Sequence, residues 1–172
     1  TKDAAAKDVM LASQNRVQSM GIIHQKLYQG KNLAAIEMLD YFKNLGENTL
    51  DAFGLNEVVE IIYNMNPVEL DVDTAVPIGL IVNELLTNSL KYAFPEGGKG
   101  IITLSLKEID NSQLHLVVAD NGIGKPQNAA PRGTGFGTQL VELLTSQLQG
   151  TAKSDYQQGT QWSFYLEKVN LN

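Results

Sequence analysis

The chain has 172 residues, 43% of them hydrophobic, and a formal net charge of −6, so it fits one globular domain with some length left for an appendage. The acidic balance, with a sequence pI of about 4.8, argues against non-specific nucleic-acid binding, which needs a positive surface. The absence of cysteine and the presence of only two histidines exclude disulfides, cysteine nucleophiles and thiolate or histidine metal clusters. No apolar run reaches membrane-spanning length, and the first residues show neither an initiator methionine nor a signal-peptide pattern, so we expect an internal piece of a longer protein.

The first half of the chain is expected to form two helices and a strand. Hydrophobic residues recur every three or four positions in two stretches separated by a break at Gly30, and Gly54 ends the second stretch. A β-branched run follows, which is typical of a strand, and residues 64–73 are expected to be irregular. The predicted bounds are residues 4–28 and 33–53 for the helices and 58–63 for the strand.

The second half combines helices with pairs of strands. Asp73 or Thr74 is expected to cap a helix that runs to about Phe94, with Pro77 in the first turn, where proline is tolerated. A turn at Asp110 joins two strands of alternating pattern. The remaining predicted elements are strands at 101–107 and 114–119, a glycine-rich loop at 121–137, a helix at 138–149 and a closing hairpin of 151–154 and 160–166. This order predicts an α/β protein, a two-layer α/β sandwich with a mixed sheet and helices on one face, plus an N-terminal helical segment.

Polar side chains share one face of the predicted third helix. Glu84 and Asn88 are four residues apart, and Lys91 and Tyr92 continue the same stripe. The Asn88 amide oxygen suits Mg²⁺, which is usually shared with substrate phosphates, and Glu84 is placed to orient a metal-bound or attacking water. Lys91 can hold a phosphate oxygen as a point charge. A helix with a solvated polar stripe would show the same pattern, so the stripe alone does not decide between the two interpretations.

A carboxylate and two glycines follow residues 116–119, which are predicted to form a buried strand. Asp120 can accept hydrogen bonds from an exocyclic amine and a neighbouring water, while Gly122 and Gly124 permit close approach of the backbone. The alternative is an ordinary Asp-Asn-Gly turn, which is the favoured interpretation when the motif is taken alone.

A third motif, with Gly133, Gly135 and Gly137, precedes the last predicted helix. Backbone N–H groups at a glycine-rich helix N-terminus form an anion site, although a lid hinge would have the same sequence. Lys125 and Arg132, in the same loop, are expected to be solvated.

In order, spacing and element context, these motifs together with Gly159-Thr160 resemble the ATP-binding fold shared by sensor histidine kinases, DNA gyrase, heat-shock chaperone ATPases and mismatch-repair ATPases. The resemblance runs from about residue 71 to the end and implies the Bergerat-type ATP-binding fold. Residues 14–28 resemble the second helix of the dimerisation-and-phosphoacceptor module in one bacterial histidine-kinase subfamily. We therefore expect residues 1–30 to be a remnant of that helical hairpin and residues 31–172 to be an ATP-binding catalytic domain.

The resemblance implies a role for each motif. Asn88 would coordinate Mg²⁺ and Glu84 would orient its water shell, while Lys91 and Tyr92 would contact phosphate and ribose. Asp120 would recognise the adenine amine. The remaining implied roles are those of Gly122 and Gly124 beside the adenine ring, Thr160 through a water, and Gly133, Gly135 and Gly137 in a lid over the triphosphate.

The function implied by the resemblance is that of a cytoplasmic protein histidine kinase, the catalytic and ATP-binding part of a two-component sensor. It would bind Mg·ATP and transfer the γ-phosphate to a histidine on the dimerisation helix of the same protein, for relay to the receiver domain of a response regulator. The parent protein is expected to be a homodimer, with or without a membrane anchor, and no nucleic acid is expected as a partner.

The chain departs from the subfamily pattern in two places. Glu84 stands where many histidine kinases have Asn and where gyrase-like relatives have a water-activating base, which leaves ATP hydrolysis open. The acceptor histidine of the subfamily precedes the helix present here, so we expect the acceptor to lie outside this chain and the chain not to phosphorylate itself at the usual site. His24 is interpreted as a packing or interface residue, and His115 as a surface or cross-strand residue.

Two other functions stay open. An ATP-hydrolysing conformational switch of the same superfamily would use Glu84 as its base. A non-catalytic nucleotide-binding module ranks last, because such modules usually lose the residues that stand here as Asn88 and Asp120.

The first predicted helix also carries an apolar stripe without a partner helix in this chain. We predict that the stripe self-associates or packs against the body of the domain. Its residues are Val9, Met10, Val17, Met20, Ile23 and Leu27.

Overall fold

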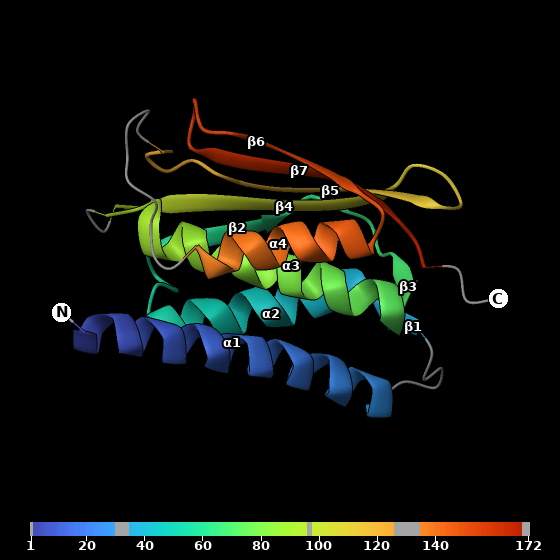
Figure 1. Cartoon of the computed structure of the whole chain (residues 1–172), viewed down its shortest axis with the longest axis horizontal. Coiled ribbons are helices and arrows are strands. Elements are labelled where there is room, and N and C mark those ends of the chain that lie inside the picture. Colours follow the sequence, from blue (N-terminus) through green and yellow to red (C-terminus); the bar gives the residue numbers. More distant parts are fainter. Residues whose placement is uncertain (1, 30–34, 96–97, 126–134, 170–172) are drawn as a thin grey trace.

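The computed structural model describes residues 2–29, 35–95, 98–125 and 135–169, which form an α/β domain preceded by a long helix (Figure 1). In chain order its elements are α1 (Lys2–Gln29), β1 (Ala35–Glu37), α2 (Met38–Phe53), β2 (Val59–Tyr63), β3 (Glu69–Asp71), α3 (Val72–Tyr92), β4 (Gly100–Glu108), β5 (Gln113–Asp120), α4 (Phe136–Gln147), β6 (Thr151–Asp155) and β7 (Thr160–Glu167).

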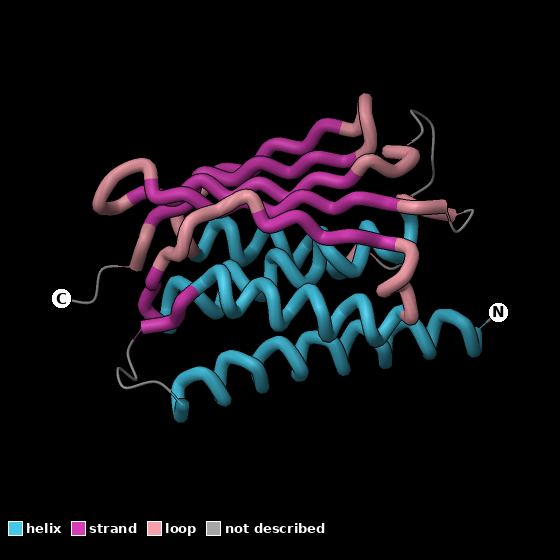
Figure 2. The backbone as a smooth tube through the Cα atoms, turned by 180° about the vertical axis from the view of Figure 1, so that it is seen from behind, coloured by secondary structure: helices cyan, strands magenta, loops and turns pink. Residues whose placement is uncertain are grey.

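Within these residues the main sheet has five strands in the order β2-β4-β5-β7-β6. β2 pairs with β4 in parallel, and the other neighbours pair in antiparallel fashion. Helices α2, α3 and α4 cover one face of the sheet, and α1 lies outside them along α2 and α3 (Figures 1 and 2). The prediction of a two-layer α/β sandwich with a mixed sheet and an N-terminal helical segment is confirmed.

The core lies between this sheet and α3. Along β5, buried residues alternate with half-buried ones, because successive side chains of a strand point to opposite faces. Leu114, Leu116 and Val118 therefore face the helices, and so does Asp120 at the end of the strand. The alternation thus carries a carboxylate to the helix-covered face of the sheet, where it is 7% exposed.

Helix α3 is buried on nearly all sides because it lies under the sheet and also contacts α1, α2 and α4. The apolar side chains of Ile81, Leu85, Leu86 and Leu90 are buried. Glu84 is also buried, with 5% of its surface exposed. The interpretation of a solvated polar stripe is therefore wrong for Glu84. Helix α1 packs over the face of α3 that carries this residue.

The second helix begins later than predicted, at Met38 instead of residue 33. Ala35–Glu37 form β1, which pairs with β3 inside the stretch 64–73 that was expected to be irregular. Glu37 ends the strand and caps the helix, since its carboxylate accepts hydrogen bonds from the backbone nitrogens of Leu39 at 3.0 Å and Asp40 at 2.9 Å.

Helix α3 begins earlier than predicted, after Asp71 rather than Asp73 or Thr74. The Thr74 hydroxyl does not cap the helix but accepts a hydrogen bond from the backbone nitrogen of Val169 at 2.9 Å. Pro77 consequently lies in the second turn and not in the first, so the expectation for Pro77 is also wrong.

Helix α4 likewise begins two residues before its predicted start, at Phe136, and ends at Gln147 rather than residue 149. Its N-cap is Gly135, whose φ of 74° places it in the left-handed region where glycine is favoured. The two predicted hairpins are confirmed. In the first of them, hydrogen bonds from the backbone of Ser112 and Gln113 lower the pKa of the Asp110 carboxyl that holds the turn.

Helix α1 runs from Lys2 to Gln29, close to the predicted bounds, and packs against α2, α3 and β1. Ile22 is buried in this contact. Four members of the predicted stripe, Val9, Met10, Val17 and Met20, are exposed, so the stripe does not pack closely against the body. The side chains of Ile23 and Leu27, and the predicted break at residues 30–32, lie outside the described part. None of the described helices is both long enough and apolar enough to cross a membrane.

Candidate functional site

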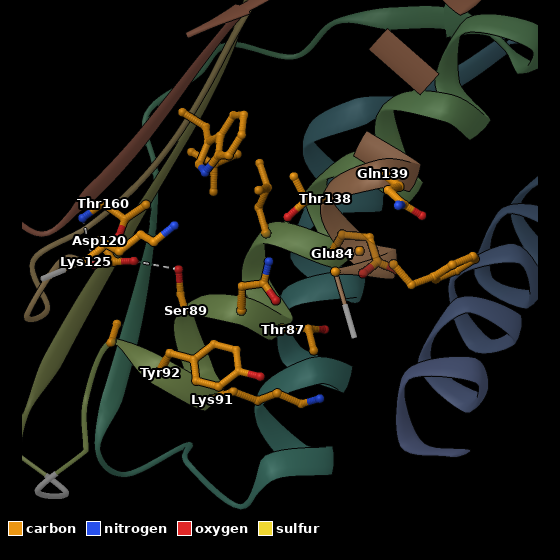
Figure 3. Close-up of a pocket in the computed structure, with 18 of the residues that line it drawn as sticks. Glu84, Thr87, Ser89, Lys91, Tyr92, Asp120, Lys125, Thr138, Gln139 and Thr160 are labelled. Atoms are coloured by element: carbon orange, nitrogen blue, oxygen red, sulfur yellow. Dashed lines mark hydrogen bonds between the residues drawn. The ribbon is translucent and has the colours of Figure 1, made fainter. Parts of the chain in front are cut away.

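A pocket of about 920 Å³ opens between α3, the ends of β5 and β7, the start of α4 and one face of α1. Its lining combines a carboxylate, amides, hydroxyls and cations with apolar and aromatic surface, which is the usual composition of a ligand site. Figure 3 shows the labelled side chains converging on it from both the sheet and the helices. We take this pocket as the candidate site.

Asp120 forms the sheet side of the pocket and is held on both carboxylate oxygens. Oδ2 accepts a hydrogen bond from the Ser89 hydroxyl at 2.7 Å, drawn as a dashed line in Figure 3. Oδ1 accepts hydrogen bonds from the backbone nitrogens of Gly122 at 3.0 Å and Thr160 at 3.1 Å. Hydrogen bonds to a carboxylate are strong, so a buried carboxylate that accepts three of them has a fixed orientation. The structure therefore brings together Asp120, Gly122 and Thr160, and it adds Ser89, which the sequence analysis missed.

Glycines surround Asp120 because the backbone segments approach one another closely. A Cβ added at Gly124, whose φ is +67°, would lie 2.5 Å from the carbonyl oxygen of Tyr156. Gly159 has a φ of +78°, and a Cβ there would overlap the carbonyl oxygen of Asp120. Gly122 packs in the same way on Ala93 at the end of α3. The glycine motif is thus required by the packing of the site and is more than an ordinary exposed turn.

The helix side of the pocket carries Asn88, Lys91 and Tyr92, all half-buried. They lie on successive turns of α3, and Lys91 and Tyr92 lie next to each other in Figure 3. Ser89 points from the same helix toward the sheet, so α3 contributes to both walls of the pocket. The predicted stripe therefore does face a cavity.

Glu84 lies one turn before Asn88 and is enclosed by two other elements. Its Oε1 accepts a hydrogen bond from the Arg16 guanidinium of α1, and the two groups form an ion pair. On the other side, a Cβ added at Gly137 of α4 would lie 2.9 Å from Oε2. Arg16 was missed as a site residue, since a single arginine on an amphipathic helix gives no local signal of a partner 68 positions away.

Part of the predicted lid can be placed. Gly135 and Gly137 line the pocket at the start of α4, whereas Gly133 and Arg132 lie outside the described residues. Lys125 is exposed, with its ammonium nitrogen 6.0 Å from the ring centre of Tyr156. Its exposure agrees with the expected solvated side chain, and it also lines the edge of the pocket.

The two histidines have different settings. His115 is on the face of β5 that points away from the helices, where its Nε2 lies 2.8 Å from the Ser163 hydroxyl and its ring stacks on Tyr165 at 4.5 Å. This confirms His115 as a cross-strand residue. His24 lies within α1, and its side chain is outside the described part of the structure.

The donor groups of the pocket fit a shared magnesium ion rather than a protein-enclosed one. Among the described residues, no three or more histidine, cysteine or acidic side chains are grouped so that they could hold a metal ion. The pocket instead offers the Asn88 amide and the Glu84 carboxylate, both oxygen donors, on adjacent turns of α3. Mg²⁺ prefers oxygen, keeps several waters and is commonly completed by substrate phosphates.

Comparison with known proteins gives two family matches in one chain. Residues 73–170 match the family described as histidine kinase-, DNA gyrase B- and HSP90-like ATPase, and residues 1–53 match a family described as histidine kinase. The first match includes every described residue of the pocket except those of α1. The family model implies that this domain binds ATP.

The curated relatives that the chain resembles are also named histidine kinases. The chain is 28% identical over 140 residues to blue-light-activated histidine kinase 2 of Erythrobacter litoralis, covering 77% of this chain and 40% of the relative. It is 26% identical over 150 residues to the sensor histidine kinase PdtaS of Mycobacterium tuberculosis, covering 85% of this chain and 29% of the relative. The chain therefore spans less than half the length of these relatives.

Solved structures of histidine kinases share the fold of this chain. The histidine kinase domain of the Erythrobacter litoralis EL346 blue-light-activated kinase superposes with a TM-score of 0.76 at 24% identity, over 90% of this chain and 74% of that one. The mycobacterial sensor histidine kinase MprB superposes with a TM-score of 0.58 at 19% identity, over 80% of this chain and 99% of that one. Because the ATPase match spans more than half of the sequence, the chain belongs to the family of histidine kinase-, DNA gyrase B- and HSP90-like ATPases, as a histidine-kinase ATP-binding domain joined to part of the phosphoacceptor module.

Proposed function

We propose that this chain is the catalytic part of a two-component sensor histidine kinase, which binds Mg·ATP and transfers its γ-phosphate to a histidine outside this chain. The observation that carries the proposal is the fixed Asp120 carboxylate on one wall of the pocket, opposite the polar face of α3 that holds Asn88. Two such walls suit a nucleotide, whose nucleobase forms hydrogen bonds at one end and whose phosphates lie at the other.

The Asp120 wall would recognise adenine. An ionised carboxylate has about four acceptor positions, and three are used here by Ser89, Gly122 and Thr160, which leaves acceptor capacity for the exocyclic amine. Gly122, which donates to Asp120, and Gly124, at the pocket wall, would lie beside the flat ring, and the Thr160 hydroxyl would act through a water. The existing hydrogen bonds fix the carboxylate before the ligand arrives, which lowers the entropic cost of binding.

The α3 wall would hold the phosphates and the metal. Asn88 would coordinate Mg²⁺, Glu84 would contact its water shell, and Lys91 and Tyr92 would contact phosphate and ribose. When bound, Mg²⁺ neutralises charge that develops on the phosphates. The N-terminus of α4, with Gly135 and Gly137, adds backbone N–H groups and the positive end of a helix dipole near the same place. Gly133 would continue this contact as part of a lid.

The residues of this chain would act mainly by positioning. They would hold the γ-phosphate so that an imidazole nitrogen of the acceptor histidine attacks in line with the departing ADP oxygen. The phosphate would then pass to an aspartate in the receiver domain of a response regulator. The exposed residues of α1 would pair two copies of the parent protein as a homodimer.

The test supplies the acceptor in trans. The chain is incubated with Mg²⁺, γ-labelled ATP and the histidine-containing hairpin of the parent protein. We expect acid-labile, alkali-stable label on that hairpin and none on this chain, and Asp120→Asn should reduce the transfer. Stable label on His24 would contradict an acceptor outside the chain, and a His24→Ala variant would locate it.

Two outcomes would instead favour the other candidates. If Mg·ATP at saturation does not raise the melting temperature, the chain is a non-catalytic binding or interaction module without a working ATP site, because any ligand of the native state must stabilise it. If phosphate is released steadily without any acceptor, the chain is an ATP-hydrolysing switch. The Arg16–Glu84 pair argues against the switch in the arrangement described, since the switch needs Glu84 as a base.

A further inference from the structure

The contact between Arg16 and Glu84 joins the N-terminal helix to the nucleotide pocket, and none of the roles proposed above uses it. The Arg16 Nε donates to Glu84 Oε1, while Ala5, Val9 and Ser13, on the same side of α1, also line the pocket. The helix that belongs to the phosphoacceptor module therefore forms one wall of the ATP site. In Figure 3 the helix ribbon of α1 lies beside Glu84.

Both charges are largely withdrawn from water. The Arg16 side chain is 19% exposed and the Glu84 side chain 6% exposed. The Arg16 guanidinium carbon also lies 4.6 Å from the ring centre of Phe136, the first residue of α4. A guanidinium that stacks on an aromatic ring and pairs with a carboxylate is held in one orientation. Arg16 thus connects α1, α3 and the start of α4 at a single point.

The contact with Arg16 determines whether Glu84 can act as a general base. A general base needs a carboxylate oxygen within hydrogen-bond reach of the attacking water. Here Oε1 accepts from Arg16, and Oε2 lies so close to Gly137 that a single added carbon would be 2.9 Å away. With α1 docked, the carboxylate is paired with Arg16 and lies between α1 and the start of α4, so the pair sets its orientation.

We propose that Arg16 is a positioning residue that restrains hydrolysis of bound ATP by holding Glu84 in this ion pair. The proposal rests on the proposed function, since it requires ATP in the pocket. In the restrained reaction, a water oxygen bonds to the γ-phosphorus and the bond from that phosphorus to the β–γ bridging oxygen breaks. ADP leaves with the electron pair, and the proton of the water passes to the Glu84 carboxylate and then to solvent.

The pair would thereby preserve the γ-phosphate for the acceptor histidine. Because Arg16 is on α1, movement of α1 away from α3 would release Glu84 and remove the restraint. Whether bound ATP is kept or hydrolysed would then depend on the docking of this helix.

The experiment measures steady-state phosphate release at saturating Mg·ATP for the wild-type chain and four variants. Arg16→Gln is expected to raise the rate about tenfold, a part of the 10²–10⁴-fold that a general base typically contributes. Arg16→Lys, which keeps the charge, should give a smaller rise. In Glu84→Gln/Arg16→Gln the rise should disappear. Lys7→Gln, which removes a positive charge from an exposed position of the same helix, should match the wild type.

Affinity for a non-hydrolysable ATP analogue is measured in parallel by calorimetry, and folding by circular dichroism. If Arg16→Gln releases phosphate no faster than the wild type while it binds the analogue, the proposal is wrong. A rise that persists in the double variant would also overturn it, because Glu84 would then not be the base. Should Arg16→Gln fail to fold, the difference between Arg16→Lys and the wild type decides in the same way. Failure of the wild type itself to bind the analogue would refute the proposed function and this inference together.

Discussion

At the scale of single residues, Asp120 shows how a binding group is prepared by its neighbours. The Ser89 hydroxyl and two backbone nitrogens hold the carboxylate at the helix-covered face of the sheet, where it is 7% exposed. None of these donors is adjacent in the chain to the others, yet together they fix one orientation. Under the proposed function, a ligand amine would meet a carboxylate whose acceptor atoms are already oriented.

Replacing Asp120 by Asn should therefore weaken ATP binding while leaving the chain folded. The amide retains one acceptor oxygen but directs N–H donors at groups that are themselves donors. A hydrogen bond to a charged group contributes about 1.5–3 kcal/mol, which corresponds to roughly a 10- to 100-fold loss of affinity in calorimetric titration. Asp110→Asn, in the exposed turn of the β4–β5 hairpin, is the matched control and should bind as the wild type does. Unchanged affinity in Asp120→Asn would refute the assignment of this wall to adenine.

The residues with a local motif could be predicted, and those without one could not. Asp120 and its glycines stand in a short recognisable pattern, and Asn88 is set by its spacing from Glu84. Ser89 looks like any helix serine, because its partner is 31 residues away, and Arg16 lies 68 residues from Glu84. The burial of Glu84 follows from the docking of α1, a tertiary contact that the periodicity of neither helix contains.

At the scale of elements, α1 combines contacts to the body with exposed apolar residues. Arg16 and Ile22 contact the body, whereas four apolar residues of the same helix are largely in solvent. Val9 is 50% exposed, Met10 64%, Val17 69% and Met20 51%. The periodicity predicted the stripe, but it could not show which of its residues would border the pocket and which would stay in solvent.

We expect the exposed stripe to mediate self-association. Exposed apolar side chains that share one face of a helix often mark an interaction site. Charges placed among them should oppose association. The wild-type chain is therefore expected to dimerise in light scattering as its concentration is raised, and Met10→Lys/Val17→Lys should remain monomeric. Gln18→Lys, an exposed position on another face of α1, serves as the control for added charge. A monodisperse wild-type monomer at all concentrations would contradict this role for the stripe.

Element types were easier to predict than element ends. The alternating strands and the long apolar helices have strong periodic signals, and each was found. The start of α2 was wrong because Glu37 provides an uncommon cap and because β1 pairs with a strand more than 30 residues later, which local patterns do not reveal. The start of α4 was wrong for a similar reason, since Gly135 acts as its cap and not as part of the preceding loop.

At the scale of the whole molecule, the architecture follows from the order of the elements, while the pocket does not. Consecutive strands with few crossovers predicted the mixed sheet and its helical layer. The pocket, in contrast, needs the ends of β5 and β7, the face of α3, the start of α4 and one side of α1 to meet. The participation of α1 depends on how the phosphoacceptor segment docks, which no motif in either segment specifies.

Stability at high pH offers a test of how the layers pack. Burial, with a smaller contribution from the Glu47 carboxylate, raises the pKa of Tyr63 from 10.0 to about 12. Its hydroxyl lies against Gly46 of α2, so this residue reports on the contact between α2 and β2. Between pH 10 and 12 the folded protein keeps a proton that the unfolded chain has lost.

The free energy of unfolding should therefore lose the Tyr63 contribution as the pH rises from about 10 toward 12, and this group should have no effect below pH 10. The upper bound is about 2.7 kcal/mol, since each tenfold change in an acid dissociation constant corresponds to about 1.4 kcal/mol. Partial solvent access at this half-buried residue lowers that figure. Urea unfolding at several pH values should show a shallower decline for Tyr63→Phe than for the wild type. Equal declines would mean that the hydroxyl is not sheltered by α2.

The long sequence separations within the site also set the order in which it can form during synthesis. Arg16 and Glu84 leave the ribosome early and can meet once α1 and α3 are complete. Asp120 must wait for a backbone nitrogen 40 residues further along, at Thr160 in the last strand. A nascent chain that stops before β7 therefore has both Arg16 and Glu84 but lacks one hydrogen-bond donor of the Asp120 site. A ligand that needs this site complete can stabilise the domain only after β7 has been made.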